Sequence, residues 1–181
     1  ILSLYGANLY GFVHRAFLEY FCASAFVWKF EKTKELTIEQ LKTDVYGKHW
    51  EDQSWHEVLR LICGMIDEKW VNEVFYYLYR MPSNEIKKMT IFNINYVSIS
   101  ADLPLAHMLS IECLCQVRNQ QIIKTCAENC LLDGDDLSYI FFLLNERIRS
   151  YPNVENIIIA TLLKSSDDSM RGFGSYLLAE Y

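Results

Sequence analysis

The chain has 181 residues, enough for one domain of ordinary size or two small lobes around a buried core. Hydrophobic residues make up 51% and charged residues 22%, with only seven glycines and three prolines, which excludes a disordered or low-complexity chain. The net charge is −6, and residues 101–181 carry 6 basic against 11 acidic groups. Because binding a phosphate backbone requires the opposite sign, this charge argues against nucleic acid as a partner of the C-terminal half.

The N-terminal sequence carries no export signal. It begins at Ile1 and continues with apolar and aromatic residues, without the charged start and small-residue cleavage site of a signal peptide. The richest apolar stretch, residues 16–28, contains Glu19 and is shorter than the about 20 residues of a membrane span. We therefore expect a segment of a longer cytoplasmic protein, with no membrane partner and with its six cysteines reduced.

Residues 1–35 are predicted to form a short β-hairpin followed by a long helix. Residues 6–8 (Gly-Ala-Asn) lie between apolar runs, a pattern typical of a hairpin turn. Helical periodicity then covers about residues 14–30, and the helix is apolar on nearly every face. Such a helix must be covered all round, so we expect a neighbouring domain over part of it and an exposed apolar patch on this chain alone.

Residues 36–100 are predicted to contain an antiparallel helical hairpin. Residues 37–40 and 54–57 match the capping box and indicate two helix starts. After the second start, apolar residues recur at helical spacing over residues 55–66, and a partner helix follows. Residues 90–100 alternate β-branched residues with Asn and Ser, which predicts a loop or a short strand.

Residues 101–181 are predicted to form stacked helix pairs. The helix starts are expected near the following residues: Pro104, Asn119, Asp135, Asn153 and Asp167. Since alternate helices then recur at about 32 residues, the pattern is typical of HEAT-like repeats. The predicted fold class is mainly α: an N-terminal β-hairpin followed by an antiparallel array of helix pairs, an α-solenoid, with at least half of the residues helical and no sheet of more than three strands.

One candidate zinc site comprises four cysteines and a histidine: His107, Cys113, Cys115, Cys126 and Cys130. On a helix, however, Cys113 and Cys115 point about 200° apart. Cys126 and Cys130 fall on an apolar stripe of their helix. Buried thiols without a metal are therefore favoured.

Two other polar clusters favour structural roles. Residues 133–136 resemble the start of a calcium loop, but the residues that follow are not its ligands, so a turn with a helix cap is favoured. His49 and His56 flank a tryptophan-rich turn, and we interpret them as polar caps beside Trp50 and Trp55. Nothing in the sequence brings together a catalytic triad.

The most informative segment is residues 10–23. It places His14 at the start of the long helix, where free backbone N–H groups and the helix dipole favour an anion. From spacing alone, this histidine either caps the helix or donates to a phosphate. The segment resembles the signature that closes the winged-helix domain of NACHT-type STAND nucleotide switches, the group that includes NOD-like receptors and their bacterial relatives. The matching residues are Phe12, His14, Phe17, Glu19 and Tyr20.

The resemblance covers about 70 residues with some specificity. It continues through residues 55–59 and the following helices, and more loosely through residues 105–114, which are similar to the HEAT-like helices that follow NACHT modules in bacterial members. It implies that residues 1–35 end a winged-helix domain, that residues 36–100 form a helical hairpin region, and that residues 101–181 form HEAT-like repeats.

The resemblance also implies roles for individual residues. His14 would reach the β-phosphate of ADP and help to hold the molecule closed until exchange for ATP releases it. Phe12, Phe17 and Tyr20 match positions that pack the winged helix, and Glu19 matches a structural acidic position. The sequence has no phosphate-loop motif. This segment is therefore expected neither to hydrolyse ATP nor to bind it tightly, whereas the longer protein would be a STAND-class ATPase that binds ADP or ATP with Mg²⁺.

The implied function is regulation and ligand sensing in anti-phage defence or related signalling. The implied partners are the upstream NACHT module of the same chain, a protein or peptide trigger, and further copies on activation. An alternative from a different class is a free-standing helical-repeat scaffold that binds a protein or peptide in its concave groove.

Overall fold

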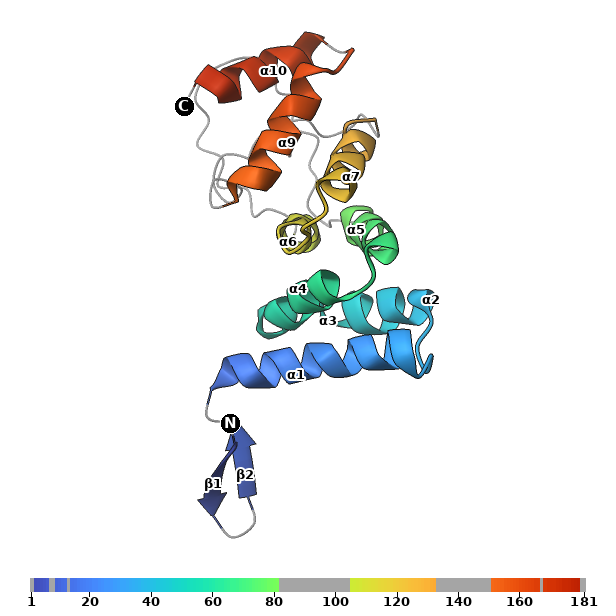
Figure 1. Ribbon diagram of the computed structural model, residues 1–181, viewed down its shortest axis with the longest axis vertical. Helices are drawn as coiled ribbons and strands as arrows, with labels where there is room; N and C mark the ends of the chain where they lie inside the picture. Colours follow the sequence, from blue (N-terminus) through green and yellow to red (C-terminus); the bar gives the residue numbers. More distant parts are fainter. Residues whose placement is uncertain are drawn as a thin grey trace.

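The structure is a computed structural model that describes residues 2–6, 9–12, 14–81, 105–132, 151–166 and 168–179. In these ranges the chain is mainly α, which confirms the predicted class. The strands β1 (Leu2–Gly6) and β2 (Leu9–Phe12) form an antiparallel two-stranded sheet with Leu2 opposite Phe12. The helices lie above this hairpin in an elongated stack (Figure 1). The expectations for residues 90–100 and 133–136, and for a helix start at Asp135, lie outside the described residues.

The first layer of the stack consists of α1, a return segment and α4. Their bounds are α1 (Arg15–Val27) with a π-helical turn (Trp28–Lys32), α2 (Ile38–Gln40), a second π-helical turn (Leu41–Tyr46), α3 (Gly47–His49), and α4 (His56–Met65). Arg15 donates to the backbone oxygen of Ser54 at one end of α1, and Glu31 accepts from the backbone N–H of Asp67 at the other. Helices α1 and α4 therefore run in the same direction.

The two predicted capping boxes have different outcomes. At the first, the Gln40 backbone N–H donates to the Thr37 hydroxyl over 3.2 Å, and the Thr37 backbone N–H donates to the Gln40 side chain over 2.9 Å. The second prediction, at Ser54, is wrong. Asp52 instead accepts from the Ser54 backbone N–H over 2.9 Å and caps a 3₁₀ turn (Gln53–Trp55) that precedes α4. A carboxylate two residues earlier thus takes the role expected of the serine.

The upper layers contain five helices in the described ranges. They are α5 (Val71–Tyr79) after a 3₁₀ turn (Glu68–Trp70), α6 (Leu105–Leu114), α7 (Gln120–Leu132), α9 (Pro152–Leu163) and α10 (Asp168–Ala179). The last four begin within one residue of their predicted starts. Helix α4 packs mainly against α1 and α6, and α5 mainly against α6 and α7. Helix α6 therefore lies against both α4 and α5, the two helices of the predicted hairpin, and the hairpin does not form a pair on its own (Figure 1).

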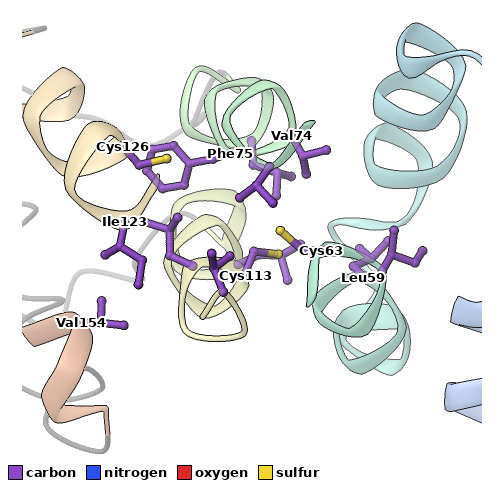
Figure 2. Packing of buried hydrophobic residues seen from close by; sticks show 14 of the residues in the cluster. Leu59, Cys63, Val74, Phe75, Cys113, Ile123, Cys126 and Val154 are labelled. Atoms are coloured by element: carbon purple, nitrogen blue, oxygen red, sulfur yellow. The ribbon is translucent and has the colours of Figure 1, made fainter. Parts of the chain in front are cut away.

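One hydrophobic cluster joins these layers. Figure 2 shows the sulfur atoms of Cys63 in α4 and Cys113 in α6 facing each other. Leu59 of α4 and Val74 and Phe75 of α5 belong to the same cluster, which extends to α7 and α9. Below it, the fully buried Tyr46 donates its hydroxyl hydrogen to the backbone oxygen of Leu59 over 2.9 Å. The stack is thus held by continuous apolar packing between neighbouring layers.

The contact between α9 and α10 depends on Gly174. A Cβ atom there would lie 3.1 Å from the Leu162 side chain and 3.1 Å from the Leu163 backbone nitrogen, whereas one at Gly172 would meet nothing within 4 Å. We expect Gly174→Leu to lower the free energy of unfolding by about 1–3 kcal/mol through overpacking. Gly172→Leu should raise it by up to about 1 kcal/mol through helix propensity. Urea unfolding followed by circular dichroism compares them, and equal effects would contradict the close packing.

Candidate functional site

His14 lies at the N-terminal boundary of α1 with its side chain exposed. Its backbone is extended, with φ −128° and ψ 137°, and its side chain makes no capping hydrogen bond. Its ring lies 6.2 Å from that of Phe17. His14 therefore does not cap the helix with its side chain. Its imidazole nitrogens are accessible at the positive end of the helix, where a phosphate could accept from them.

Glu19 has a structural role in the first turns of α1. It accepts from the Arg15 guanidinium over 2.6 Å, and its side chain is 14% exposed. The same guanidinium donates to the backbone oxygen of Ser54 over 3.0 Å. Glu19 and Arg15 thus fix the start of α1 to the turn before α4.

The aromatic residues of the matched segment lie mostly outside the core. Phe12 of β2 stacks on Phe21 with 5.8 Å between ring centroids, and Tyr20 meets Phe21 edge-on at 5.5 Å. Phe17 is 38% exposed and Tyr20 is 49% exposed. The packing role that the resemblance implies for Phe17 and Tyr20 is therefore not fulfilled by the described residues.

Helix α1 presents an apolar surface on the side away from α4. We call it the outer face of α1, and it comprises Phe17, Leu18, Tyr20, Phe21 and Trp28, which are 38–60% exposed. The opposite side, with Ala23 in α1 and Phe30 in the π-helical turn, is buried towards the rest of the stack. Because apolar side chains occur all round the helix and only one side packs, the expected exposed patch is present.

Three cysteines distant in sequence lie together in the core. The thiols of Cys63 in α4 and Cys113 in α6 face each other, and their sulfur atoms lie side by side in Figure 2. Cys126 of α7 donates its thiol hydrogen to the Asn72 side-chain oxygen over 3.4 Å. Burial raises the pKa of Cys113 and raises the pKa of Cys126 to about 12. The thiols of Cys113 and Cys126 therefore stay protonated at neutral pH, which makes them poor nucleophiles and poor metal ligands.

The candidate zinc residues do not form one described site. Cys113 is fully buried in α6, whereas Cys115, in the turn that follows this helix, is only partly buried. The side chains of His107 and Cys130 lie outside the described residues. Among the residues that the structure does describe, no group of three or more His, Cys, Asp or Glu side chains could hold a metal ion.

The two histidines of the tryptophan-rich turn cap it as predicted. The His49 ring stacks on Trp55 with 3.7 Å between centroids and a 6° interplanar angle. The Nε2 atom of His56 lies 2.7 Å from the backbone oxygen of Trp50. Both tryptophans are half-buried rather than fully buried.

A cleft of about 390 Å³ opens between the end of α4, the start of α5 and residues 116–118. Apolar side chains such as Leu61 and Val117 line it, together with the polar side chains of Glu68, Gln116 and Arg118. Its volume lies in the range of small-ligand pockets. Sequence reasoning missed this cleft because its walls come from segments about 50 residues apart.

Comparisons with known proteins give no assignment: no family model matches this chain, and no curated protein or solved structure is significantly similar to it. Within the described ranges, every helix is too short or too polar to cross a lipid bilayer.

Proposed function

We propose that this chain is the regulatory and ligand-sensing segment of a NACHT-type STAND nucleotide switch, acting in the cytoplasm in anti-phage defence or related signalling. The observation that carries the proposal is the position of His14 at the positive end of α1, where its side chain is exposed and makes no capping hydrogen bond. The outer face of α1, which the described residues leave uncovered, begins one turn later. The donor and the adjoining apolar surface fit a nucleotide module that docks at this end of the chain.

In the proposed mechanism, His14 donates a hydrogen bond to the β-phosphate of ADP held by an upstream module. The outer face of α1 packs against that module in the closed state, and both contacts are lost when the module opens after exchange for ATP with Mg²⁺. A protein or peptide trigger that contacts the helical stack shifts the balance between the two states, and the open form assembles with further copies. The chain itself contributes the latch and the sensor and is not an enzyme.

The order of elements supports this domain assignment. The hairpin followed directly by α1 fits the end of a winged-helix domain within residues 1–35. The helical segments over residues 36–81 and the regularly spaced helices after residue 104 fit an α-solenoid of HEAT-like pairs. Among these helices, α7 packs against α9 and α9 against α10, whereas α6 packs mainly against α5 and α4.

A helical-repeat scaffold that binds a protein or peptide is the second candidate. The specific observation in its favour is the cleft beside residues 116–118, which requires no upstream module. It would account for the stack and leave His14 without a role.

Replacing His14 with alanine tests the first proposal. A hydrogen bond to a charged group contributes about 1.5–3 kcal/mol, so its loss should speed ADP dissociation from the longer protein by about 10- to 150-fold. Signalling without a trigger should follow where the latch is not needed in the active assembly. The measurement is the ADP off-rate of wild-type and His14→Ala protein at matched folded concentration.

Two controls make this test specific. His14→Gln keeps a donor at similar reach and should restore part of the slow off-rate. His49→Ala removes a histidine whose ring is stacked on Trp55 and should leave the off-rate unchanged. Equal off-rates for wild type and His14→Ala would remove His14 from the nucleotide site and favour the scaffold.

A further inference from the structure

The outer face of α1 changes in character along the helix. Its N-terminal half is aromatic, with Phe17 and Phe21 one turn apart, and Phe12 of the hairpin stacks on Phe21. Its centre carries two small residues, Ser24 and Ala25, whose side chains point about 100° apart and flank the middle of the face. Small residues between large ones allow a second helix to approach the backbone of α1 closely.

The C-terminal half of this face is aromatic and cationic. Trp28 is 60% exposed, the most exposed large hydrophobic side chain among the described residues. Lys29 and Lys32 beside it are exposed, and neither forms an ion pair with a described residue. The Glu31 carboxylate forms no ion pair with either lysine among the described residues and instead accepts from the backbone N–H of Asp67.

We propose that two copies of this chain pair through the outer faces of α1, antiparallel, about a two-fold axis between Ser24 and Ala25. This arrangement sets Phe21 of each copy against Trp28 of the other. The ammonium group of Lys32 then comes over the Phe17 ring of the second copy, where a cation–π contact replaces its missing partner. Ser24 and Ala25 of one copy meet Ala25 and Ser24 of the other beside the axis, as an isologous contact requires.

A second copy fits this face better than an unrelated partner, because the two halves of the face complement each other. The aromatic rings of its N-terminal half attract cations, and the lysines of its C-terminal half supply them. An antiparallel copy therefore places a lysine near an aromatic ring at both ends of the contact. Since an aromatic side chain spans about 150–250 Å², the five residues of the outer face, about half exposed, offer roughly 500 Å² per copy. A standard interface buries about 800 Å² per partner, so this smaller face predicts a weak contact of about micromolar strength.

The inference does not depend on the proposed nucleotide switch, since it rests on the side chains of α1 alone. An upstream module docked on α1 would occupy the same face, so pairing and module docking exclude each other. The test below uses the 181-residue chain without nucleotide, so its failure is separate from that of the ADP measurement.

Sedimentation of the 181-residue chain from about 1 to 500 μM tests the pairing. We expect a monomer–dimer equilibrium with a dimer of twice the 21.3 kDa chain mass. Trp28→Glu should raise the Kd about 30-fold or more, because it places a charge at the centre of the contact. The matched control is Leu178→Glu on α10, where the side chain is 51% exposed at the far end of the stack, and it should leave the Kd within about twofold.

Cross-linking tests the antiparallel register. Ala25→Cys places a thiol beside the two-fold axis and should form a disulfide-linked dimer with oxidised glutathione, whereas Ala160→Cys at an exposed position of α9 should not. Circular dichroism verifies that each variant is folded. A chain that stays monomeric throughout, a Kd unchanged by Trp28→Glu, a dimer lost in Leu178→Glu, or equal cross-linking at both positions would each overturn the proposal.

Discussion

Raising the pH from about 8 to about 10 is expected to lower the free energy of unfolding by about 3 kcal/mol through Cys115 and Cys126 alone. Burial raises the pKa of both thiols from 9.0 to about 12. Between these values the unfolded chain has released thiol protons that the folded chain retains. The unfolded state therefore binds fewer protons, and stability falls as the pH rises through the unfolded pKa.

Two more buried groups act in the same direction. Burial raises the pKa of Cys113 and of Tyr46 well above their ordinary values. Both groups therefore also lower the free energy of unfolding as the pH becomes alkaline. Urea unfolding at three pH values measures the slope. Cys126→Ala is the control, since it removes one thiol and should reduce the loss between about pH 8 and about pH 10 by roughly 1.4 kcal/mol. A stability that does not change over this interval would contradict the burial of these thiols.

Replacing Phe75 with alanine is expected to lower the free energy of unfolding by about 3–5 kcal/mol. Phe75 is 2% exposed, and its ring lies 5.7 Å from Tyr76 and 5.8 Å from Tyr79. It belongs to the cluster between α5 and its neighbours in Figure 2. Truncation leaves a cavity there that rigid helices on several sides cannot close.

Phe17→Ala is the matched control, because it makes the same chemical change on the outer face of α1. If Phe17 were buried, its truncation would lower the free energy of unfolding about as much as truncation of Phe75. Because Phe17 is 38% exposed, we expect a loss of at most about 1 kcal/mol. Urea unfolding of dilute samples, below the concentration at which copies would pair, gives both values. Similar costs for the two variants would show that Phe17 is covered in solution.

Much of the local structure could be read from the sequence. The starts of α6, α7, α9 and α10, and the capping box at Thr37, follow from residues within one or two turns of each other. The error at Ser54 is of the same local kind, since Asp52 competes for the same backbone N–H. The π-helical turns after α1 and α2 were not predicted, because the spacing of their apolar side chains does not distinguish them from an α-helix.

The sequence identified the residues of the candidate site but not how their side chains are arranged in space. Sequence placed His14 at the start of the long helix, but whether its side chain caps that helix depended on the backbone geometry at one residue. The pairing of Arg15 with Glu19 follows helical spacing, whereas the bond from Arg15 to Ser54 joins residues 39 positions apart. The sequence likewise could not say which side of the apolar helix α4 would cover.

By itself, the sequence determined the mainly α class, the starts of α6, α7, α9 and α10, and a helix with apolar side chains all round, because hydrogen bonds and side-chain periodicity within a helix are local. Tertiary structure alone decided that α6 lies against both α4 and α5, that Cys63 meets Cys113, and that Phe17 and Trp28 face solvent. These contacts join residues far apart in the chain. They are selected by the shape and volume of packed side chains, which no local pattern encodes.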